Sequence, residues 1–310
     1  MEPIRGLHHV TAISGPAQEN LDFYAGVLGM RLVKKSVNQD DPGTYHLFYA
    51  DAAGSPGTDL TFFPWSQMAP ARRGHGLATE VALTVPSGSL EFWSARLERY
   101  GIERNPIEER FGARTLALTD PHRMPLALTE SAEHRGSEPW SDSPVPAERQ
   151  IRGLEGARAW ERELAPTTAF LEQAMGFQKL GEERGWERWT VGRDESERSS
   201  GGWLDLRAAP DSPRGAWGTG AIHHLAWRVD DLEHQAAVRE RVGAEGARPT
   251  PVIDRFWFQS VYFREPGGVL FELATDGPGF AVDEDAAHLG ETLVLPPLKM
   301  HTPAAPAIGE

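Results

Sequence analysis

Alternating apolar and polar positions followed by helix-like spacing recur four times along the chain. Each repeat begins with an alternating run, which favours a strand, and continues through a helical stretch that ends at a glycine. The alternating runs are LHHVTAIS from Leu7, ATEVALTV from Ala78, GLEGARAW from Gly153 and AIHHLAWRV from Ala221. The helix-ending glycines, 20, 21, 21 and 19 residues beyond His9, Glu80, Glu155 and His224, are Gly29, Gly101, Gly176 and Gly243. Such constant spacing indicates an internal repeat.

The end of each repeat predicts further strands. A turn precedes a strand-like run in PGTDLTFF from Pro56, PHRMPLAL from Pro121 and PGGVLFEL from Pro266, and GGWLDLRA from Gly201 is a looser match. We therefore predict an α+β fold of four units, each a strand, a helix and three strands (βαβββ). The Pro- and Ser-rich stretch at residues 139–148 predicts a linker. Residues 1–138 then hold units one and two, and residues 149–310 hold units three and four plus a C-terminal extension.

Composition narrows the chemistry available to these units. The 310 residues suffice for two domains, at roughly 100–200 residues each. With 31 basic and 45 acidic residues the net charge is −14, which disfavours nucleic acid and acidic membrane surfaces as partners. No apolar run approaches the ~18–20 residues of a membrane span, and residues 1–6 hold no signal-peptide core, so we expect a cytoplasmic protein. Because cysteine is absent, metal ligands must come from the 11 histidines and the carboxylates.

Histidine pairs distinguish the first and fourth units. Both units carry a His-His pair at the same point of the first strand, where about 0.4 such pairs are expected in the whole chain by chance. The dipeptides at this point are, in unit order, His8-His9, Thr79-Glu80, Leu154-Glu155 and His223-His224. Since successive strand side chains point to opposite faces, we expect one histidine of each pair to face the concave interior and its neighbour to face away. Unpaired histidines such as His46 are expected at the surface or in loops.

A glutamate distinguishes the last strand of the fourth unit. Glu272 lies within VLFELAT, where burying a carboxylate is costly unless it is paired or bound to metal. Alignment on the Pro-Gly turn places Phe62 and Ala127 at the same point of units one and two, and Leu206 or Asp205 in unit three. Two histidines and a carboxylate form the facial set of non-haem Fe(II) oxygenases, which leaves about three of six octahedral positions open.

This ligand set makes two further predictions. A metal held between two copies of the unit could have four protein ligands, two from each copy. Phe62, at the first-unit position that corresponds to Glu272, cannot coordinate, so the site should be open on one side, which favours oxygenase chemistry over a fully ligated isomerase site. Metal bonds of ~2.0–2.2 Å also require the first and fourth units to meet around one cavity, although they lie at opposite ends of the chain. Units two and three should then form a second cavity that lacks ligands.

Several motifs together resemble the vicinal oxygen chelate superfamily, and within it the ring-cleaving dioxygenases that act on hydroquinones. They span most of the chain and are LHHVT, DFYAGVLGMRLVKK, YHLFYAD, GSPGTDLTFFP, IHHLAW, YFREPGGVLFELATDGPGF and DEDAAHLGE. The resemblance implies that the units form two half-open, mixed-sheet barrels and that the metal is Fe(II). It also implies that the ligands are His9, His224 and Glu272.

Further roles follow from the resemblance and from strand direction. The resemblance implies that His8, His223, Arg255 and Tyr262 act on the substrate as catalytic groups. Thr11 lies two residues beyond His9, so it shares that face of the strand and should line the cavity. Phe62 and Trp227 are expected as apolar walls of the same cavity. The RFWFQS stretch, residues 255–260, is more aromatic than we expect for the members of this group that act on chlorinated substrates. The identity of the substrate is therefore left open.

The implied activity is Fe(II)-dependent opening of a hydroquinone-type ring with O2. Mn(II) is the alternative metal, since both ions accept nitrogen and oxygen ligands in octahedral geometry. Three other functions stay open: a catechol-type extradiol dioxygenase, a glyoxalase-like metal isomerase, and a protein that binds a small aromatic molecule without catalysis. The expected partners are a small aromatic diol and O2, without nucleic acid or membrane. The oligomeric state is left open, a homo-oligomer included.

Overall fold

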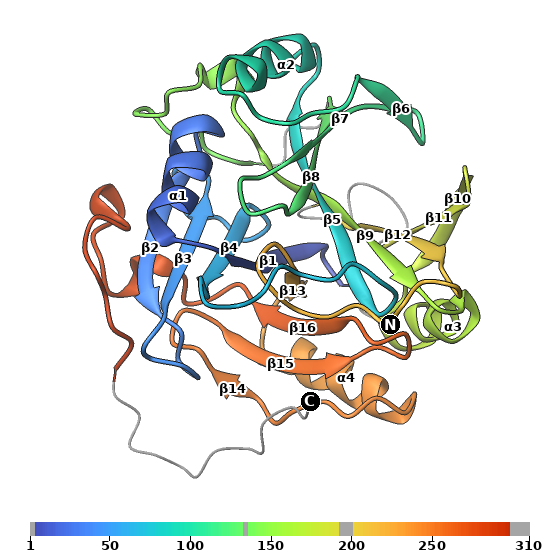
Figure 1. The fold of residues 1–310 in the computed structure, drawn as a ribbon. Coiled ribbons are helices and arrows are strands. Elements are labelled where there is room, and N and C mark those ends of the chain that lie inside the picture. The colour runs from blue at the N-terminus through green and yellow to red at the C-terminus, as the bar shows by residue number, and fades with distance from the viewer. Residues whose placement is uncertain (1–3, 133–135, 192–200, 298–310) are drawn as a thin grey trace.

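Two eight-stranded mixed sheets make up the body of the protein in the computed structural model, which describes residues 4–132, 136–191 and 201–297 (Figure 1). The first sheet has the order β14-β15-β16-β13-β1-β4-β3-β2 and the second β10-β11-β12-β9-β5-β8-β7-β6. In chain order, the strands of the first sheet are β1 (Leu7–Ser14), β2 (Arg31–Val37), β3 (Tyr45–Ala50), β4 (Asp59–Pro64), β13 (Ile222–Val229), β14 (Ile253–Asp254), β15 (Gln259–Arg264) and β16 (Leu270–Thr275). Those of the second sheet are β5 (Leu77–Pro86), β6 (Glu108–Arg110), β7 (Ala113–Thr119), β8 (Pro125–Ser131), β9 (Gly153–Glu161), β10 (Gln178–Glu183), β11 (Trp186–Thr190) and β12 (Trp203–Ala208).

The order of strands confirms the predicted α+β architecture and the pairing of units. Strand β1 of the first unit pairs antiparallel with β13 of the fourth, and β5 of the second unit pairs antiparallel with β9 of the third. Within each unit, the first strand pairs in parallel with the last, as in β1–β4 and β13–β16. Each sheet therefore draws four strands from either side of residues 139–148.

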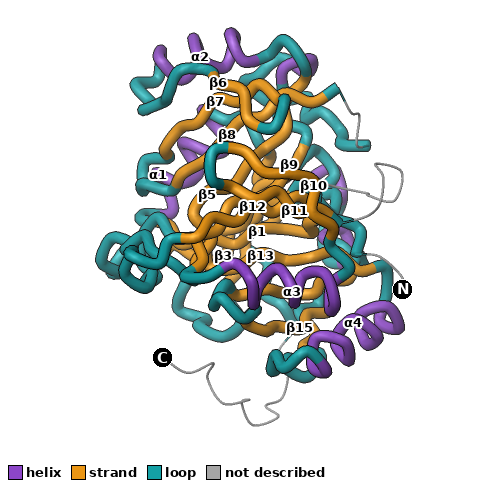
Figure 2. The backbone as a smooth tube through the Cα atoms, turned by 90° about the vertical axis from the view of Figure 1, so that its right-hand side faces the viewer, coloured by secondary structure: helices purple, strands orange, loops and turns teal. Residues whose placement is uncertain are grey.

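Helices cover the outside of the two sheets (Figure 2). They are α1 (Ala17–Leu21), which continues as a π-helical segment (Asp22–Val27), α2 (Leu90–Arg99), α3 (Leu164–Met175) and α4 (Leu232–Ala244). Gly29, Gly101 and Gly176 have positive φ angles of 73°, 69° and 74°, in keeping with the predicted helix ends. The fourth helix differs, because α4 runs past Gly243 and the left-handed residue that follows it is Gly246.

The C-terminal extension packs against the concave side of the first sheet. Phe280 and Leu289 of the extension join an apolar cluster with Val33, Phe48 and Trp257. Lys34 of β2 is fully buried beneath them and donates to the Phe280 carbonyl at 3.0 Å and to Asp283 at 2.7 Å. The extension therefore closes part of the half-barrel that the strands of the first sheet leave open.

The expected linker lies against the body of the protein. Residues 139–148 contain no strand, and Val145 is buried in the main apolar core. Ser143 donates to the carbonyl of Gly29 at 2.7 Å, which ties the segment to the first unit. Among the helices in the described part of the chain, none is long and apolar enough to cross a membrane.

Candidate metal centre

Three side chains converge on the concave face of the first sheet. His9 of β1 and His224 of β13 come from neighbouring strands, and Glu272 lies on β16, next to β13. His9 and His224 are 3% and 4% exposed, and Glu272 is 0% exposed. The Nε2 atoms of the two histidines are 3.2 Å apart, and they lie 3.2 Å and 2.9 Å from Oε2 of Glu272. The prediction that the first and fourth units meet around one site is confirmed.

These distances fit a metal ion. Three ligand atoms at ~2.1 Å from a metal and at right angles to one another lie about 3.0 Å apart. The triangle of 3.2, 3.2 and 2.9 Å is close to that spacing. Oε2 of Glu272 also has no hydrogen-bond partner with acceptable geometry within the described residues, although it is fully buried. A buried carboxylate oxygen with no donor is the feature that a bound cation satisfies.

The protonation of Glu272 and His224 suits ligation. Burial alone would raise the pKa of the Glu272 carboxyl, but the neighbouring imidazoles of His9 and His224 outweigh it and hold that pKa well below its usual range. Burial lowers the pKa of His224. An ionised carboxylate and a neutral imidazole are the forms that bind a metal. Ser260 of β15 donates to the other oxygen of Glu272, Oε1, at 2.5 Å and so orients the carboxylate.

β-Bulges explain the position of the first histidine of each pair. The register between β1 and β13 shifts between Leu7 and His9, so that His8 is an extra residue, and it shifts again at His223. A bulge brings two consecutive side chains to one side of a strand, so the expectation that His8 and His223 face away from the site is wrong. Nδ1 of His8 lies 2.9 Å from Nδ1 of His9, and the His223–His224 contact is 2.8 Å.

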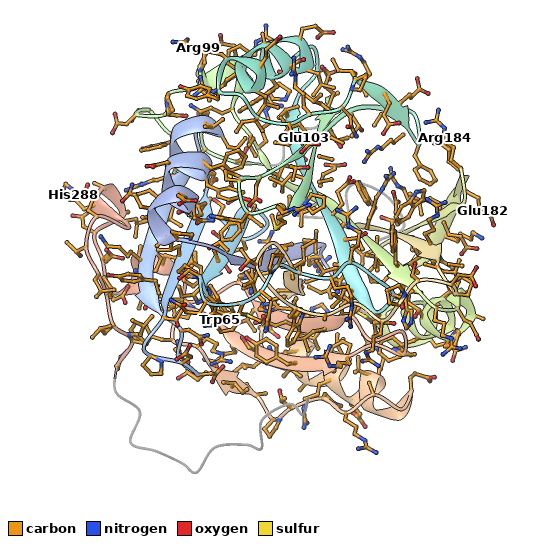
Figure 3. All side chains as sticks on the ribbon, viewed as in Figure 1. Trp65, Arg99, Glu103, Glu182, Arg184 and His288 are labelled. Carbon is orange, nitrogen blue, oxygen red and sulfur yellow. The ribbon has the colours of Figure 1, made fainter. Side chains whose placement is uncertain are left out.

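The two first histidines lie beside the ligands, but neither is among the residues that line the cavity over the site. Burial, followed by the neighbouring histidine, lowers the pKa of both His8 and His223, so each imidazole is neutral. His223 stacks on Trp217 with ring centroids 4.2 Å apart and lies 6.1 Å from Trp65. Trp65 is at the junction of the first-unit and fourth-unit strands (Figure 3). Contacts at Nδ1 leave Nε2 of His9 and His224 free to face the site.

A small cavity lies directly over the metal-site residues. Its empty space, part of which is open to solvent, is about 380 Å³. The wall contains the expected residues His9, Thr11, His224, Arg255 and Tyr262. The remaining wall residues are Asn38, Gln39, Asp40, His46, Phe48, Phe63, Trp257 and Phe258.

Arg255 and Tyr262 form the polar side of this cavity. Nη1 and Nη2 of Arg255 bind the carboxylate of Asp40 at 3.2 Å and 2.8 Å, and the guanidinium lies 5.4 Å from the ring centre of Tyr262. Burial opposes the charge of Arg255, but Tyr262 and Asp40 outweigh it and raise the pKa of the guanidinium. Burial raises the pKa of Tyr262, so its phenol keeps its proton. The cavity thus has a fixed positive charge and a phenolic donor beside the metal-site residues.

Two of the expected wall residues lie elsewhere. Phe62 is fully buried on the opposite face of β4, where its ring packs 4.4 Å from that of Tyr24. Trp227 is fully buried between Phe177 and Phe271 in the main core. Both assignments to the cavity are therefore wrong, because each residue falls on the core side of its strand.

The strand register also corrects the alignment on the Pro-Gly turn. Glu272 pairs with Ala226, two residues beyond His224, and Thr61 pairs with Thr11, two residues beyond His9. The counterpart of Glu272 in the first unit is therefore Thr61 and not Phe62, because the turn of the fourth unit is one residue longer. The first-unit counterpart of Glu272 is thus still neither a carboxylate nor an imidazole. The prediction of a site that is open on this side therefore holds with Thr61 in place of Phe62.

In the second sheet, salt bridges replace the ligand set. By the same register, the counterparts of His9, His224 and Glu272 are Glu80, Gly156 and Asp205, so the alignment of Leu154-Glu155 with the histidine pairs is one residue too early. Arg158 and Arg188 bind Asp205 at 3.2 Å and 2.7 Å. Guanidinium groups therefore supply the positive charge that a metal would supply in the first sheet.

Packing also excludes a histidine from the second site. A Cβ atom on Gly156 would lie 2.1 Å from the ring of Trp203, which packs in a cluster with Ala82 and Ala127. The position of His224 therefore has no imidazole counterpart in the second sheet.

Three wall residues do not follow from the sequence patterns. His46, expected at the surface, is half-buried on β3 and lines the cavity. The alternation in YHLFYA, which places His46 and Phe48 on one face, is the signal that could have found it. Trp257 and Phe258 belong to an irregular segment before β15, for which strand parity makes no prediction.

Comparison with known proteins identifies relatives of the chain. The family model of the Glyoxalase/Bleomycin resistance protein/Dioxygenase superfamily matches residues 6–128 and 158–273. The chain is 42% identical over 291 residues to MhqO of Bacillus subtilis (strain 168), which is provisionally named a ring-cleaving dioxygenase; the match covers 94% of this chain and 91% of MhqO. It is 33% identical to the chlorohydroquinone/hydroquinone 1,2-dioxygenase of Sphingobium indicum, over 96% of this chain and 92% of that protein.

Solved structures agree on the fold. A crystal structure of a provisionally named dioxygenase from Bacillus subtilis matches with a TM-score of 0.89 at 40% identity, covering 96% of this chain and 93% of the other. Glyoxalase I from Zea mays matches with a TM-score of 0.62 at 15% identity, over 87% of this chain and 92% of that one. The second likeness concerns the fold alone.

Proposed function

The chain belongs to the Glyoxalase/Bleomycin resistance protein/Dioxygenase superfamily, and from this premise we propose that it opens the ring of a hydroquinone-type aromatic diol with O2 in a metal-dependent reaction. The observation that carries the proposal is the triangle of His9, His224 and Glu272. The first-unit counterpart of Glu272 is Thr61, which is neither a carboxylate nor an imidazole. A facial set of three ligands leaves adjacent positions for two small molecules. That arrangement suits a reaction that joins a phenol and O2.

The proposed metal is Fe(II), with Mn(II) as the alternative, held by His9, His224 and Glu272. When bound, the metal supplies a Lewis acid that favours the deprotonated phenol and brings it close to O2. His8 and His223 are assigned as positioning residues, because each contacts Nδ1 of the neighbouring ligand and neither lines the cavity. The neutral imidazoles fix the ring orientation of His9 and His224.

Arg255 and Tyr262 are assigned to the substrate. The guanidinium of Arg255 is held against the cavity by Asp40, so its positive charge stabilises negative charge on the substrate oxygens. The Tyr262 hydroxyl keeps its proton and can donate it in a hydrogen bond to the same oxygens. Thr11 and the aromatic wall of Phe48, Phe63 and Phe258 enclose the ring and limit water.

Oxygen consumption by protein reconstituted anaerobically with Fe(II) tests the proposal. Hydroquinone should be consumed with one O2 per ring opened. Catechol should be consumed more slowly, because the site is proposed to bind a diol through one oxygen, whereas the adjacent hydroxyls of catechol would both contact the metal. His224→Ala should abolish consumption, whereas the control His288→Ala, at the outer edge of the C-terminal extension (Figure 3), should not.

Three results would contradict the proposal in different ways. Faster consumption with catechol would assign an ortho-diol substrate. Turnover with Ni(II) or Zn(II) and no O2 uptake would assign an isomerase. Binding of aromatic ligands that persists in His224→Ala, without any turnover, would assign a binding protein.

A further inference from the structure

His46 stands in the cavity wall with its ring held on both sides. Its side chain lies between Phe48 and Phe63, with ring centroids 3.9 Å and 4.5 Å away. Both of these aromatic rings line the same cavity as His9 and His224. A ring packed between two others on a strand has little freedom to turn, so its nitrogen atoms keep fixed positions.

A chain of buried hydroxyls fixes one nitrogen of this ring. Nε2 of His46 lies 3.0 Å from Oγ1 of Thr61, and Oγ1 of Thr61 lies 2.8 Å from Oγ1 of Thr11. Thr11 and Thr61 are fully buried, so water does not compete for these contacts. Thr61 is the counterpart of Glu272, so this chain borders the side of the metal site that has no fourth ligand.

The other nitrogen of His46 makes no contact of this kind within the described residues. Within the described residues, Nδ1 has no hydrogen-bond partner, and it is not among the buried polar atoms that lack one, so it is accessible. Burial lowers the pKa of His46, so the ring is neutral. A neutral imidazole whose Nε2 is engaged presents Nδ1 as one hydrogen-bonding group, whichever way the hydroxyl chain runs.

Besides Thr11 and residues 38–40, whose side chains contact other protein groups, polar groups line the cavity at two places. The first place is the metal site with Arg255 and Tyr262, and the second is His46 on the strand next to β4. Phe48 and Phe63 form the apolar wall beside His46, and Phe258 forms the apolar wall beside His9. A flat ring that carries a hydroxyl at each end matches this distribution, whereas a ring with two adjacent hydroxyls places both oxygens at the metal.

We propose that His46 determines specificity for para-diols, because its Nδ1 forms a hydrogen bond with the ring hydroxyl that points away from the metal. The proposal rests on the function proposed above and adds to it the residue that reads the second oxygen. The ligand class is a single-ring phenol with a hydrogen-bonding group opposite the hydroxyl that meets the metal.

Anaerobic binding measurements test the role of His46 without any turnover. Calorimetric Kd values for hydroquinone and for phenol, which lacks the second hydroxyl, are compared in the Fe(II)-loaded protein. The wild type should prefer hydroquinone, and His46→Phe should weaken hydroquinone about 3- to 10-fold, the effect of one neutral hydrogen bond, while leaving phenol unchanged. Phenylalanine keeps the ring between Phe48 and Phe63, so the packing is preserved.

Two amide variants separate the two nitrogens. The amide of asparagine reaches the position of Nδ1, and the amide of glutamine reaches that of Nε2. His46→Asn should therefore keep the preference for hydroquinone, and His46→Gln should lose it. A structural role for the ring would instead weaken both ligands equally in all three variants, and this would overturn the proposal.

The test distinguishes failure of this proposal from failure of the proposed function. Preference for hydroquinone that depends on His46, in a protein that consumes no O2, would retain the specificity residue and reject the dioxygenase. If the protein opens the ring but His46→Phe still prefers hydroquinone to phenol, the dioxygenase function is retained and the role of His46 is rejected. Failure of the wild type to bind hydroquinone more tightly than phenol would also overturn the role of His46.

Discussion

Thr61 occupies on β4 the register position that Glu272 occupies on β16. Each pairs with a residue two positions beyond a candidate metal ligand, Thr61 with Thr11 and Glu272 with Ala226. The two halves of the site are therefore related by the repeat, with a carboxylate on one side and a hydroxyl on the other. This difference leaves the first-unit side of the candidate metal site without a fourth ligand.

Restoring the carboxylate should close the site. In Thr61→Glu, a fourth ligand would occupy a position that the substrate needs, so metal should stay bound while O2 consumption falls below detection. Metal content and oxygen uptake measured on the same sample check this, with Thr61→Val as the variant that cannot coordinate. Undiminished oxygen uptake by Thr61→Glu would show that this position is not at the metal.

Ser260 should matter to metal affinity and little to folding. It donates to Oε1 of Glu272 at 2.5 Å and fixes the direction in which Oε2 points. Loss of such an outer contact typically weakens metal binding about 10- to 100-fold, so Ser260→Ala should show this loss in a competition titration with a chelator. Thr275→Val, a change at a buried residue on β16 that does not contact Glu272, is the matched control. Equal affinities in Ser260→Ala and the wild type would contradict the assigned role.

The second sheet should contribute stability and no metal binding. Asp205 is fully buried and holds Arg158 and Arg188, so Asp205→Asn leaves two guanidinium groups without their carboxylate. Breaking a buried pair in this way costs about 3–5 kcal/mol of the free energy of unfolding, which urea titration measures. Metal stoichiometry should be unchanged in the folded variant. A loss of metal from Asp205→Asn would place a metal in the second sheet.

Glu161 should make the stability of the protein depend on pH. It is fully buried, and burial, followed by the charge of Glu265, raises its pKa to about 9. The folded protein therefore keeps this proton up to about pH 9, whereas the unfolded chain loses it near pH 4.3, so the contribution to stability is present at low pH and declines as the pH rises through this window.

Glu161→Gln removes this decline. The Tm of the variant relative to the wild type should rise between pH 5 and pH 9, as measured by thermal unfolding. Glu163→Gln, at an exposed position two residues away, should show no such trend. A constant difference in Tm across the range would mean that Glu161 is ionised in the folded protein.

The pairing of units and the metal-site triangle could both be predicted from the sequence. The repeated His-His pairs and the lone Glu272 carry both predictions, because a repeat allows equivalent positions of one chain to be compared directly with one another. The wrong predictions concern which face of a strand a side chain lies on. Bulges at His8 and His223 and one extra residue in the PGG turn each move side chains by one position, and strand alternation has no means of registering such insertions.

Other parts of the site have no repeat to reveal them. His46 is a single histidine in a strand, and its role depends on Thr61 and Thr11 from two other strands. The same holds for Asp40, whose contact with Arg255 joins residues 215 positions apart in the sequence. Contacts of this kind follow from the closure of the half-barrel and its C-terminal extension, which local patterns do not encode.

Metal stoichiometry in the purified protein tests the central claim most directly. Elemental analysis after anaerobic loading with Fe(II) and removal of free metal should find one ion per chain in the wild type and in His288→Ala. Glu272→Gln keeps the shape of the side chain but removes its charge, and it should retain none. Two ions per chain, or one ion that persists in Glu272→Gln, would contradict a single site built by His9, His224 and Glu272.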